Sequence, residues 1–218
     1  MDADNRKIPS HEVTYARLRD MILFGHLAPG APVTIQGLIA DLGAGMTPVR
    51  EAIRRLTAEG ALLPQGNRRV AVPELSADLL DQVAFARLAI ESRLAELACA
   101  RLTPAQIDRL EAIDGKVNRA IEAGNLPDYL AANHAFHFAL YEAAEAPVLL
   151  DLARSLWLRA GPSLRAVIDR YGREAAPDLH REAIAAMRAR DATALAKAIE
   201  RDIQQGVDHV RQALTEAP

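Results

Sequence analysis

The sequence is short of the residues that support disulfide-bonded folds, membrane spans and aromatic cores. Cys99 is the single cysteine in 218 residues, so the chain has no internal disulfide, which fits a reducing cytosol. We find no signal peptide and no apolar run of the roughly 20 residues that cross a bilayer. Aromatic residues make up 4% of the chain, so the core has to be built mostly from Ala, Leu, Ile and Val. These absences favour a mainly helical cytoplasmic protein without a membrane partner.

Positive charge is also scarce overall, but it is gathered in one region. The formal net charge is −3, which by itself does not indicate a nucleic-acid-binding protein. Residues 1–72 nevertheless carry nine Lys and Arg against seven Asp and Glu, whereas residues 73–218 carry 17 against 22. Between Met46 and Arg69 there are five arginines and two acids. Because attraction to phosphate depends on where charge is placed, this local basic face predicts contact with nucleic acid.

The stretch Gly43–Glu59, GAGMTPVREAIRRLTAE, is typical of a tight turn followed by a short DNA-contacting helix. We expect Thr47 to cap this helix and Pro48 to take its first position. Arg50 points away from the apolar side, where a guanidinium can fork onto a guanine edge or bind phosphate. The alternative is a surface helix whose arginines are merely solvated. The apolar stripe of the helix is formed by Val49, Ile53 and Leu56.

Two more helices are predicted before this one. The first covers His11–Phe24, and the turn Pro29-Gly30 ends that unit. Thr34 then caps a short helix at Ile35–Leu42, and Gly60 closes the helix that follows the tight turn. Three short helices around one apolar core are the basis of a helix-turn-helix domain.

A hairpin is predicted directly after the third helix. Ala61–Val72, ALLPQGNRRVAV, has two apolar arms around Gln65-Gly66-Asn67, and Arg68 lies just past the tip. A basic hairpin in this position is a wing that reaches the DNA backbone or the minor groove. Residues 1–72 are therefore predicted to form a winged helix-turn-helix.

The rest of the chain, 78–218 after a linker at 73–77, shows helical patterns and no strand pattern. Ser76 is placed to cap the first helix, and prolines mark most of the later starts. The sequence therefore predicts an antiparallel six-helix bundle, so that the whole protein is mainly α. The six helices are expected at about 76–101, 104–123, 127–144, 147–170, 176–189 and 192–214.

Arg87 lies at the centre of an apolar stripe on the first bundle helix. A buried arginine needs an anionic partner, and two partners are possible. Glu91, one turn further on, would make the arginine a structural residue. The other possibility is the carboxylate of a small effector, which the planar guanidinium suits.

Four further polar residues lie on inward-facing stripes of the bundle helices. They are Asn133 and His137 on the third helix, His180 on the fifth and Asp202 on the last. Two imidazoles and two oxygen side chains that converge inside a bundle can hold a divalent metal, and this ligand mix suits Zn, Ni, Mn or Fe. The alternative is a set of separate, hydrogen-bonded core residues, because only Asn133 and His137 form a local pair.

The first third of the sequence resembles the DNA-binding domain of GntR-type bacterial transcription regulators. The match runs through PGAPVTIQGLIADLG and TPVREAIRRLTAEGALLPQGNRRVAV, about sixty residues in all. This resemblance implies that DNA is contacted by the helix start and by the wing around Gly66. Together with the basic residues beside them, the predicted DNA-contacting set is Gln36, Met46, Thr47, Arg50, Arg54, Gly66, Asn67 and Arg68.

Two positions depart from the pattern of that family. Met46 stands where an arginine is common, and Gln36 stands where some members carry another arginine. A thioether cannot make the bidentate contact to guanine that an arginine makes. DNA binding is therefore expected to persist with an operator sequence different from the common one.

Residues 76–214 resemble the FCD ligand-sensing domain that follows the GntR winged helix. The resemblance rests on VAFARLAIE, NHAFHFAL and HREAIAAMRARD. It implies a metal site at Asn133, His137, His180 and Asp202, where the family typically has one Asp and three His. Asn and Asp can still ligate through oxygen. The six helices fit the VanR-like branch better than the seven-helix FadR-like one.

The sequence as a whole predicts a bacterial, ligand-responsive transcription regulator. We expect a repressor that binds a near-palindromic operator as a homodimer, with a small carboxylate effector held by Arg87. One alternative is a constitutive DNA-binding dimer without an effector. Another is a helical metal-dependent hydrolase that uses His137, His180 and Asp202, although no H-E-x-x-H signature supplies a general base.

Overall fold

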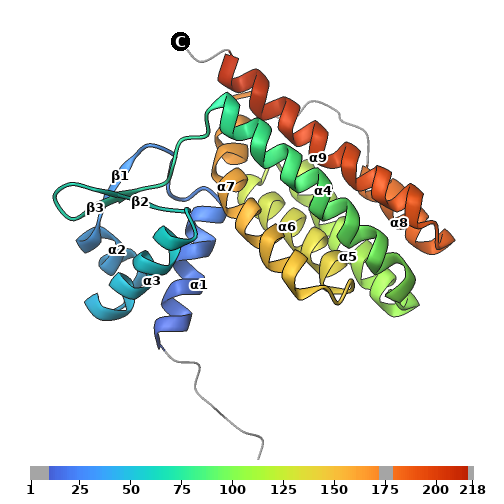
Figure 1. The fold of residues 1–218 in the computed structure, drawn as a ribbon, viewed down its shortest axis with the longest axis horizontal. Helices are drawn as coiled ribbons and strands as arrows, with labels where there is room; N and C mark the ends of the chain where they lie inside the picture. The colour runs from blue at the N-terminus through green and yellow to red at the C-terminus, as the bar shows by residue number, and fades with distance from the viewer. Residues whose placement is uncertain (1–9, 172–178, 216–218) are drawn as a thin grey trace, which may run out of the picture.

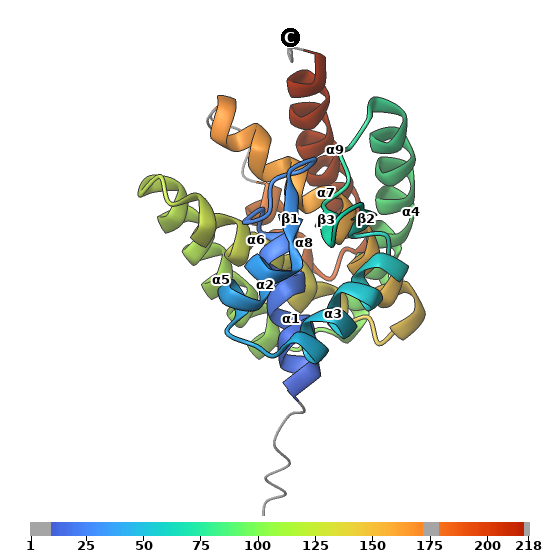
Figure 2. The same ribbon diagram turned by 90° about the vertical axis from the view of Figure 1, so that its left-hand side faces the viewer.

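The computed structural model describes residues 10–171 and 179–215, which form two helical bodies (Figure 1). The N-terminal body, called the head below, holds α1–α3 and a small sheet, and the C-terminal body, called the bundle, holds α4–α9. Figure 2 looks from the side of the head, with α1, α2 and α3 in front of the bundle. The predicted architecture, a winged helix-turn-helix before an antiparallel bundle, is confirmed.

The elements lie close to their predicted ranges. In the head they are α1 (Ser10–Leu23), β1 (Pro32–Thr34), α2 (Ile35–Leu42), α3 (Met46–Ala58), β2 (Leu63–Gln65) and β3 (Arg69–Ala71). In the bundle they are α4 (Ala77–Arg101), α5 (Pro104–Glu122), α6 (Leu126–Glu142), α7 (Pro147–Tyr171), α8 (Leu179–Ala189) and α9 (Ala192–Thr215). The predicted start of the fifth bundle helix, at 176, lies outside the described residues.

Residues next to the first helix of the helix-turn-helix fix both of its ends. The Oγ1 atom of Thr34 accepts a hydrogen bond from the Gly37 amide at 3.0 Å, so the predicted cap of α2 is confirmed. Gly43 ends α2 in the left-handed region at φ 58°, where glycine has no steric penalty.

The predicted cap of α3 is wrong. The helix begins at Met46 with Gly45 as its N-cap residue, so Thr47 lies inside the first turn and makes no capping bond. Pro48 is the third helical residue rather than the first. It is tolerated there because none of the first four amides of a helix has a partner within the helix. The Val49 amide makes the first helical bond, to the Gly45 carbonyl at 3.3 Å.

The wing is a three-stranded antiparallel sheet with strand order β1-β3-β2. Strands β2 and β3 form the predicted hairpin, in which Gln65 pairs with Arg69. Asn67 and Arg68 turn the chain at φ 60° and 58°, in the left-handed region. The pairing of β1 with β3 was not predicted, because a strand of three residues carries too little periodicity to be recognised.

The bundle buries a continuous apolar core between its helices. Helix α4 packs along α9, α5 along α6, and α8 along α9 (Figure 1). Small side chains on α4, such as Ala95 and Ala98, let the helices approach closely, and Phe136 and Tyr141 of α6 fill the centre. None of the helices over residues 10–171 and 179–215 is both long and apolar enough to cross a bilayer.

The core of the head extends into the bundle. Leu18, Leu38 and Leu56 come from the three head helices and are fully buried. The same cluster includes three bundle residues, Phe138 of α6 and Trp157 and Leu158 of α7. Since burial of each large apolar side chain stabilises by roughly 1.5–3 kcal/mol, the head is fixed against the bundle by hydrophobic packing.

Candidate nucleic-acid interface and bundle site

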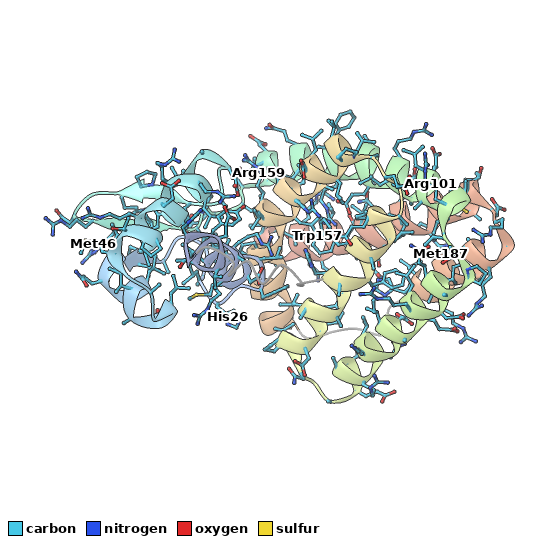
Figure 3. All side chains as sticks on the ribbon, turned by 90° about the horizontal axis from the view of Figure 1, so that it is seen from below. His26, Met46, Arg101, Trp157, Arg159 and Met187 are labelled. Atoms are coloured by element: carbon cyan, nitrogen blue, oxygen red, sulfur yellow. The ribbon has the colours of Figure 1, made fainter. Side chains whose placement is uncertain are left out.

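The start of α3 is an exposed surface at the end of the head. Val49, Ala52 and Leu56 are buried on the inner side of the helix, which leaves its other side free. Met46 is 43% exposed and lies far from the bundle (Figure 3). The other three predicted DNA contacts at this end are exposed as well, namely Gln36, Thr47 and Arg50. This surface has the exposure that contact with a DNA groove requires.

The three arginines of α3 differ in the hydrogen-bond and ion-pair partners of their side chains. The Arg50 side chain makes no ion pair or hydrogen bond with any residue in the described part of the chain. Arg54 is held by the Glu51 carboxylate through bonds of 2.6 and 3.0 Å. Arg55 pairs with Glu12 at 2.9 Å and stacks over a tyrosine ring of α1. Arg50 is therefore the arginine of α3 that is free to bind phosphate or a base edge.

The tip of the wing adds a second basic element. Gly66, Asn67, Arg68 and Arg69 are all exposed, and neither arginine has an acidic partner among the described residues. Arg69 was not among the predicted DNA contacts, yet its guanidinium is exposed like that of Arg68. Free cations on an exposed hairpin suit the phosphate backbone.

Inside the bundle, side chains from α6, α8 and α9 meet at one point. The Nε2 atom of His137 lies 3.4 Å from Nε2 of His180 and 3.1 Å from Oδ2 of Asp202. Nε2 of His180 is 4.0 Å from Oδ1 of Asp202. Both histidines are buried, and the Asp202 side chain is 22% exposed. Three of the four predicted metal ligands are therefore together.

Asn133 is the fourth predicted ligand. It is buried on α6, one helical turn before His137. It makes no hydrogen bond with another described side chain. An amide oxygen in this position is available for a ligand.

The other nitrogen of each histidine is held by a partner outside this point. Nδ1 of His180 lies 2.9 Å from Oδ1 of Asp114, on α5. Nδ1 of His137 lies 3.1 Å from the Tyr141 hydroxyl, which donates its proton to Oε2 of Glu91 at 2.7 Å. The hydroxyl has one proton, so it accepts from His137 and the imidazole Nδ1 must be the donor.

This hydrogen bonding determines the protonation of the two histidine nitrogens that face the centre of the site. A neutral His137 with its proton on Nδ1 directs a lone pair from Nε2, and the same holds for His180 against the Asp114 carboxylate. Two lone pairs and the carboxylate of Asp202 then converge with no donor between them. A cation, either a metal ion or a proton, is what satisfies this geometry.

The residues fit a divalent metal ion. Two imidazole nitrogens bound at about 2.0–2.1 Å in tetrahedral geometry are roughly 3.4 Å apart, and the Nε2 atoms of His137 and His180 are 3.4 Å apart. A carboxylate or similar group on the second nitrogen of each histidine is the usual support of a metal-ligating imidazole. This chain has both supports, Asp114 and the Tyr141–Glu91 pair.

The charges around the site favour an ionised carboxylate. Burial raises the pKa of Asp202. When the imidazoles are protonated, the hydrogen bond from His137 and the positive charges of His137, His180 and Arg87 outweigh burial, so the pKa of Asp202 is below its ordinary value. Burial and the neighbouring Glu91 carboxylate hold the pKa of Tyr141 well above its ordinary value. Tyr141 therefore remains a neutral donor.

Arg87 has the internal partner that the sequence offered as one possibility. Its Nε donates to Oε1 of Glu91 at 2.6 Å and its Nη2 to Oε2 at 3.3 Å. The guanidinium lies over the Trp157 ring at 4.7 Å. Burial lowers the pKa of Arg87, but the Glu91 carboxylate outweighs this and raises it. Nη1 makes no hydrogen bond within the described residues, so one edge of the guanidinium is open.

Sequence reasoning missed the residues that support the histidines. Asp114 lies between Leu110 and Val117 on the buried stripe of α5, and an acid on such a stripe is a detectable signal. Tyr141 follows His137 by one helical turn, which places the two side chains on the same face. Trp157 carries no pattern that would have linked it to the site.

Two family models match this chain. The model "Bacterial regulatory proteins, gntR family" covers residues 11–72, and the model "FCD domain" covers residues 82–205. The chain belongs to the GntR family and carries an FCD domain. The predicted membership of the GntR family and the predicted FCD domain are confirmed.

Two transcription factors of Escherichia coli K12 are similar in sequence. The HTH-type transcriptional regulator McbR is 33% identical over 147 residues, which is 67% of this chain and 66% of that protein. The HTH-type transcriptional repressor RspR is 26% identical over 213 residues, which covers 94% of this chain and 90% of that protein.

Solved structures of relatives have the same fold. The structure of E. coli McbR/YncC superposes with a TM-score of 0.90 at 26% identity, over 95% of this chain and 99% of that one. A putative GntR regulator from Rhodococcus sp. RHA1 superposes with a TM-score of 0.76 at 22% identity, over 94% and 99%. The chain is thus a DNA-binding transcription regulator of the GntR/FCD type and not an enzyme.

Proposed function

We propose that this regulator is an effector-responsive repressor whose bundle site holds a divalent metal ion next to a small carboxylate. The observation that carries the proposal is the convergence of His137, His180 and Asp202, with both imidazole lone pairs directed at the carboxylate. When the imidazoles are neutral, no side chain in the described part of the bundle donates a hydrogen bond to these atoms. Asn133 would complete the set, and the mixture of nitrogen and oxygen ligands suits Zn, Ni, Mn or Fe.

The effector would bind between the metal ligands and the open edge of Arg87. A bound metal ion would supply positive charge and a free coordination position for the effector. The chain itself supplies the guanidinium, already oriented by Glu91 and by the Trp157 ring, beside the two buried histidines. Planar recognition by an arginine favours a carboxylate over a neutral ligand.

DNA would be read by the exposed start of α3 and by the wing. The proposed contacts are Gln36, Met46, Thr47, Arg50, Arg54, Gly66, Asn67 and Arg68, with Arg54 shared with Glu51. Two copies related by a two-fold axis would place two heads on the half-sites of a near-palindromic operator. The effector changes operator affinity only to the extent that it favours one arrangement of the heads over another.

We also propose the division of the chain that this function implies. Residues 1–72 would be the DNA-binding domain, 73–77 the linker, and 78–218 the sensing and dimerisation domain. The six helices that residues 77–171 and 179–215 form support placement in the VanR-like branch of the family. A regulator of this kind acts on DNA in the bacterial cytoplasm.

Elemental analysis of purified, tag-free protein tests the metal proposal directly. We expect near-stoichiometric divalent metal in the wild type, and its loss in His180→Ala. The matched control is His209→Ala, which removes a partly buried histidine of α9 that is not part of the site. Absence of metal from the wild type after incubation with Zn²⁺, Ni²⁺, Mn²⁺ and Fe²⁺ would contradict the proposal.

A screen of small carboxylates tests the effector proposal separately. Binding is measured as a thermal shift, and each hit is then tested for its effect on binding to a DNA duplex selected from a random pool. We expect at least one hit whose thermal shift is lost in Arg87→Met and which changes DNA affinity. If every acid that binds leaves DNA affinity unchanged, the protein is a constitutive DNA-binding dimer.

A further inference from the structure

Helix α7 touches both the bundle site and the end of the DNA-reading helix. At one position, the Trp157 indole donates to Oε2 of Glu91 at 3.0 Å, and its ring centroid lies 5.2 Å from that of His137. Two residues further along, Arg159 lies at the junction of head and bundle (Figure 3). Its Nη2 donates to the backbone carbonyl of Glu59 at 3.0 Å.

Glu59 is the C-cap residue of α3. The last carbonyls of a helix have no partner within the helix and carry partial negative charge, so a guanidinium satisfies both their hydrogen bonding and their dipole. The next residue, Gly60, has φ +73°, and a Cβ placed there would lie 2.5 Å from Nη2 of Arg159. The absence of a side chain at Gly60 is therefore what lets the guanidinium reach the helix end.

The contact is reinforced by close packing of α7 on the head. A Cβ at Gly161 would lie 2.6 Å from the carbonyl oxygen of Leu23, at the end of α1. Trp157 and Leu158 are buried in the same cluster as Leu56 of α3. The orientation of α3 thus depends on the position of α7, through the hydrogen bond from the charged Arg159 side chain and through packed apolar side chains.

We propose that Arg159 is a positioning residue that sets the orientation of the DNA-reading helix relative to the bundle. It acts through α3 rather than on DNA, because Glu59 and Met46 lie at opposite ends of this helix, about 20 Å apart at 1.5 Å per residue. If a change in the bundle site displaces Trp157 and with it α7, the bond from Arg159 displaces α3, the helix proposed to read the operator. The proposal rests on the DNA-reading role of α3, but not on the presence of a metal ion.

Operator binding of full-length Arg159→Gln, Arg159→Lys and Arg154→Gln tests the proposal. Arg154 is the matched control, because it is on α7 and pairs with Glu142 and Asp151 of the bundle. With a duplex selected by the wild type, we expect about tenfold weaker binding for Arg159→Gln and near-wild-type binding for Arg154→Gln. Arg159→Lys, which keeps the charge, should recover most of the loss.

The salt dependence of binding separates positioning from direct contact with DNA. A lost phosphate contact would reduce the slope of log K against log salt by about one. We expect Arg159→Gln to leave this slope unchanged. A reduced slope, or binding equal to that of Arg154→Gln, would overturn the proposal.

Fluorescence of Trp157, the single tryptophan of the chain, provides a readout that a merely stabilising role would not change. We expect the selected duplex to alter this fluorescence in the wild type and in Arg154→Gln, but not in Arg159→Gln. Amide exchange in the last turn of α3 should also be faster in Arg159→Gln without DNA. The proposal would be refuted if Arg159→Gln showed the same fluorescence change on DNA addition as the wild type and the same rate of amide exchange in α3. Repeating the titrations in EDTA keeps this result separate from the metal proposal.

Discussion

Tyr141 donates its phenolic proton to Glu91 across 2.7 Å, and this bond decides which nitrogen of His137 faces the centre of the bundle site. The hydroxyl can then only accept from Nδ1, so Nε2 is left as a lone pair directed at Asp202. An interaction between α4 and α6 thus orients the Nε2 atom of His137, the proposed metal ligand, in a way that neither helix could alone.

Tyr141→Phe is therefore expected to weaken metal binding about 10–100-fold, although all the proposed metal ligands are still present. The reason is that the imidazole of His137 loses the acceptor that fixes its tautomer and its ring orientation. Competition with a chromophoric chelator measures the affinity. The matched variant Tyr15→Phe removes a hydroxyl in the head and should leave it unchanged. Equal affinities in the two variants would show that the hydroxyl does not orient His137.

Glu91 is fully buried in the bundle, and it accepts hydrogen bonds from Arg87, Tyr141 and Trp157. Glu91→Gln is expected to lower the free energy of unfolding by about 3–5 kcal/mol, because Arg87 loses the charge that compensates it. Glu96→Gln on the same helix breaks an exposed pair with Arg93 and should cost about 0–1 kcal/mol. Urea denaturation compares the two variants. A cost for Glu91→Gln as small as that of Glu96→Gln would mean that the pair is not structurally important.

Arg50 is the unpaired arginine of α3. Arg50→Ala is expected to weaken operator binding by about 1–3 kcal/mol, because a base or phosphate contact at the start of α3 is lost. Arg101→Ala, at the far end of the bundle (Figure 3), should leave binding unchanged. Fluorescence anisotropy with a labelled duplex measures both. Wild-type affinity in Arg50→Ala would place the DNA contact elsewhere on the head.

Tyr15 links the stability of the head to alkaline pH. Burial and the hydrogen bond to Glu59 raise the pKa of its phenol to about 12, whereas an unfolded tyrosine titrates near pH 10. Between these values the folded state holds a proton that the unfolded state has lost, so stability falls as pH rises. The Tyr15→Phe variant should not show this loss of stability at alkaline pH. Urea midpoints at about pH 8 and pH 11 measure it, and parallel declines in both proteins would contradict the assignment.

Gly161 allows the close approach of α7 to α1. Gly161→Ala is expected to destabilise the protein by about 1–3 kcal/mol, because the new Cβ would overlap the Leu23 carbonyl. Gly206→Ala on α9 meets no atom within 4 Å and should instead stabilise by roughly 0.5–1 kcal/mol. Thermal unfolding of the two variants checks the opposite signs. Stabilisation by both would show that the two helices can separate without cost.

The sequence by itself determined the helices of this protein, the hairpin of the wing and their order, whereas the three-residue strand β1 was not predicted. Signals within a few residues of one another are sufficient for this, as with Thr34 at the start of α2 or the glycine and asparagine at the tip of the wing. The motif around Arg50 also predicted the helix α3, for which we propose the contact with DNA. The error at its start was local too, since Gly45 and Thr47 both precede the same apolar stripe and either could have been the cap.

Only the tertiary structure decided which side chains meet. His180 and Asp114 are 66 residues apart, as are Trp157 and Glu91, and each pair depends on how two packed helices are rotated and aligned. The same is true of the bond from Arg159 to the end of α3, which spans 100 residues. Helical periodicity tells which face of a helix is buried, but the register between two buried faces is set by the packing of all their side chains together.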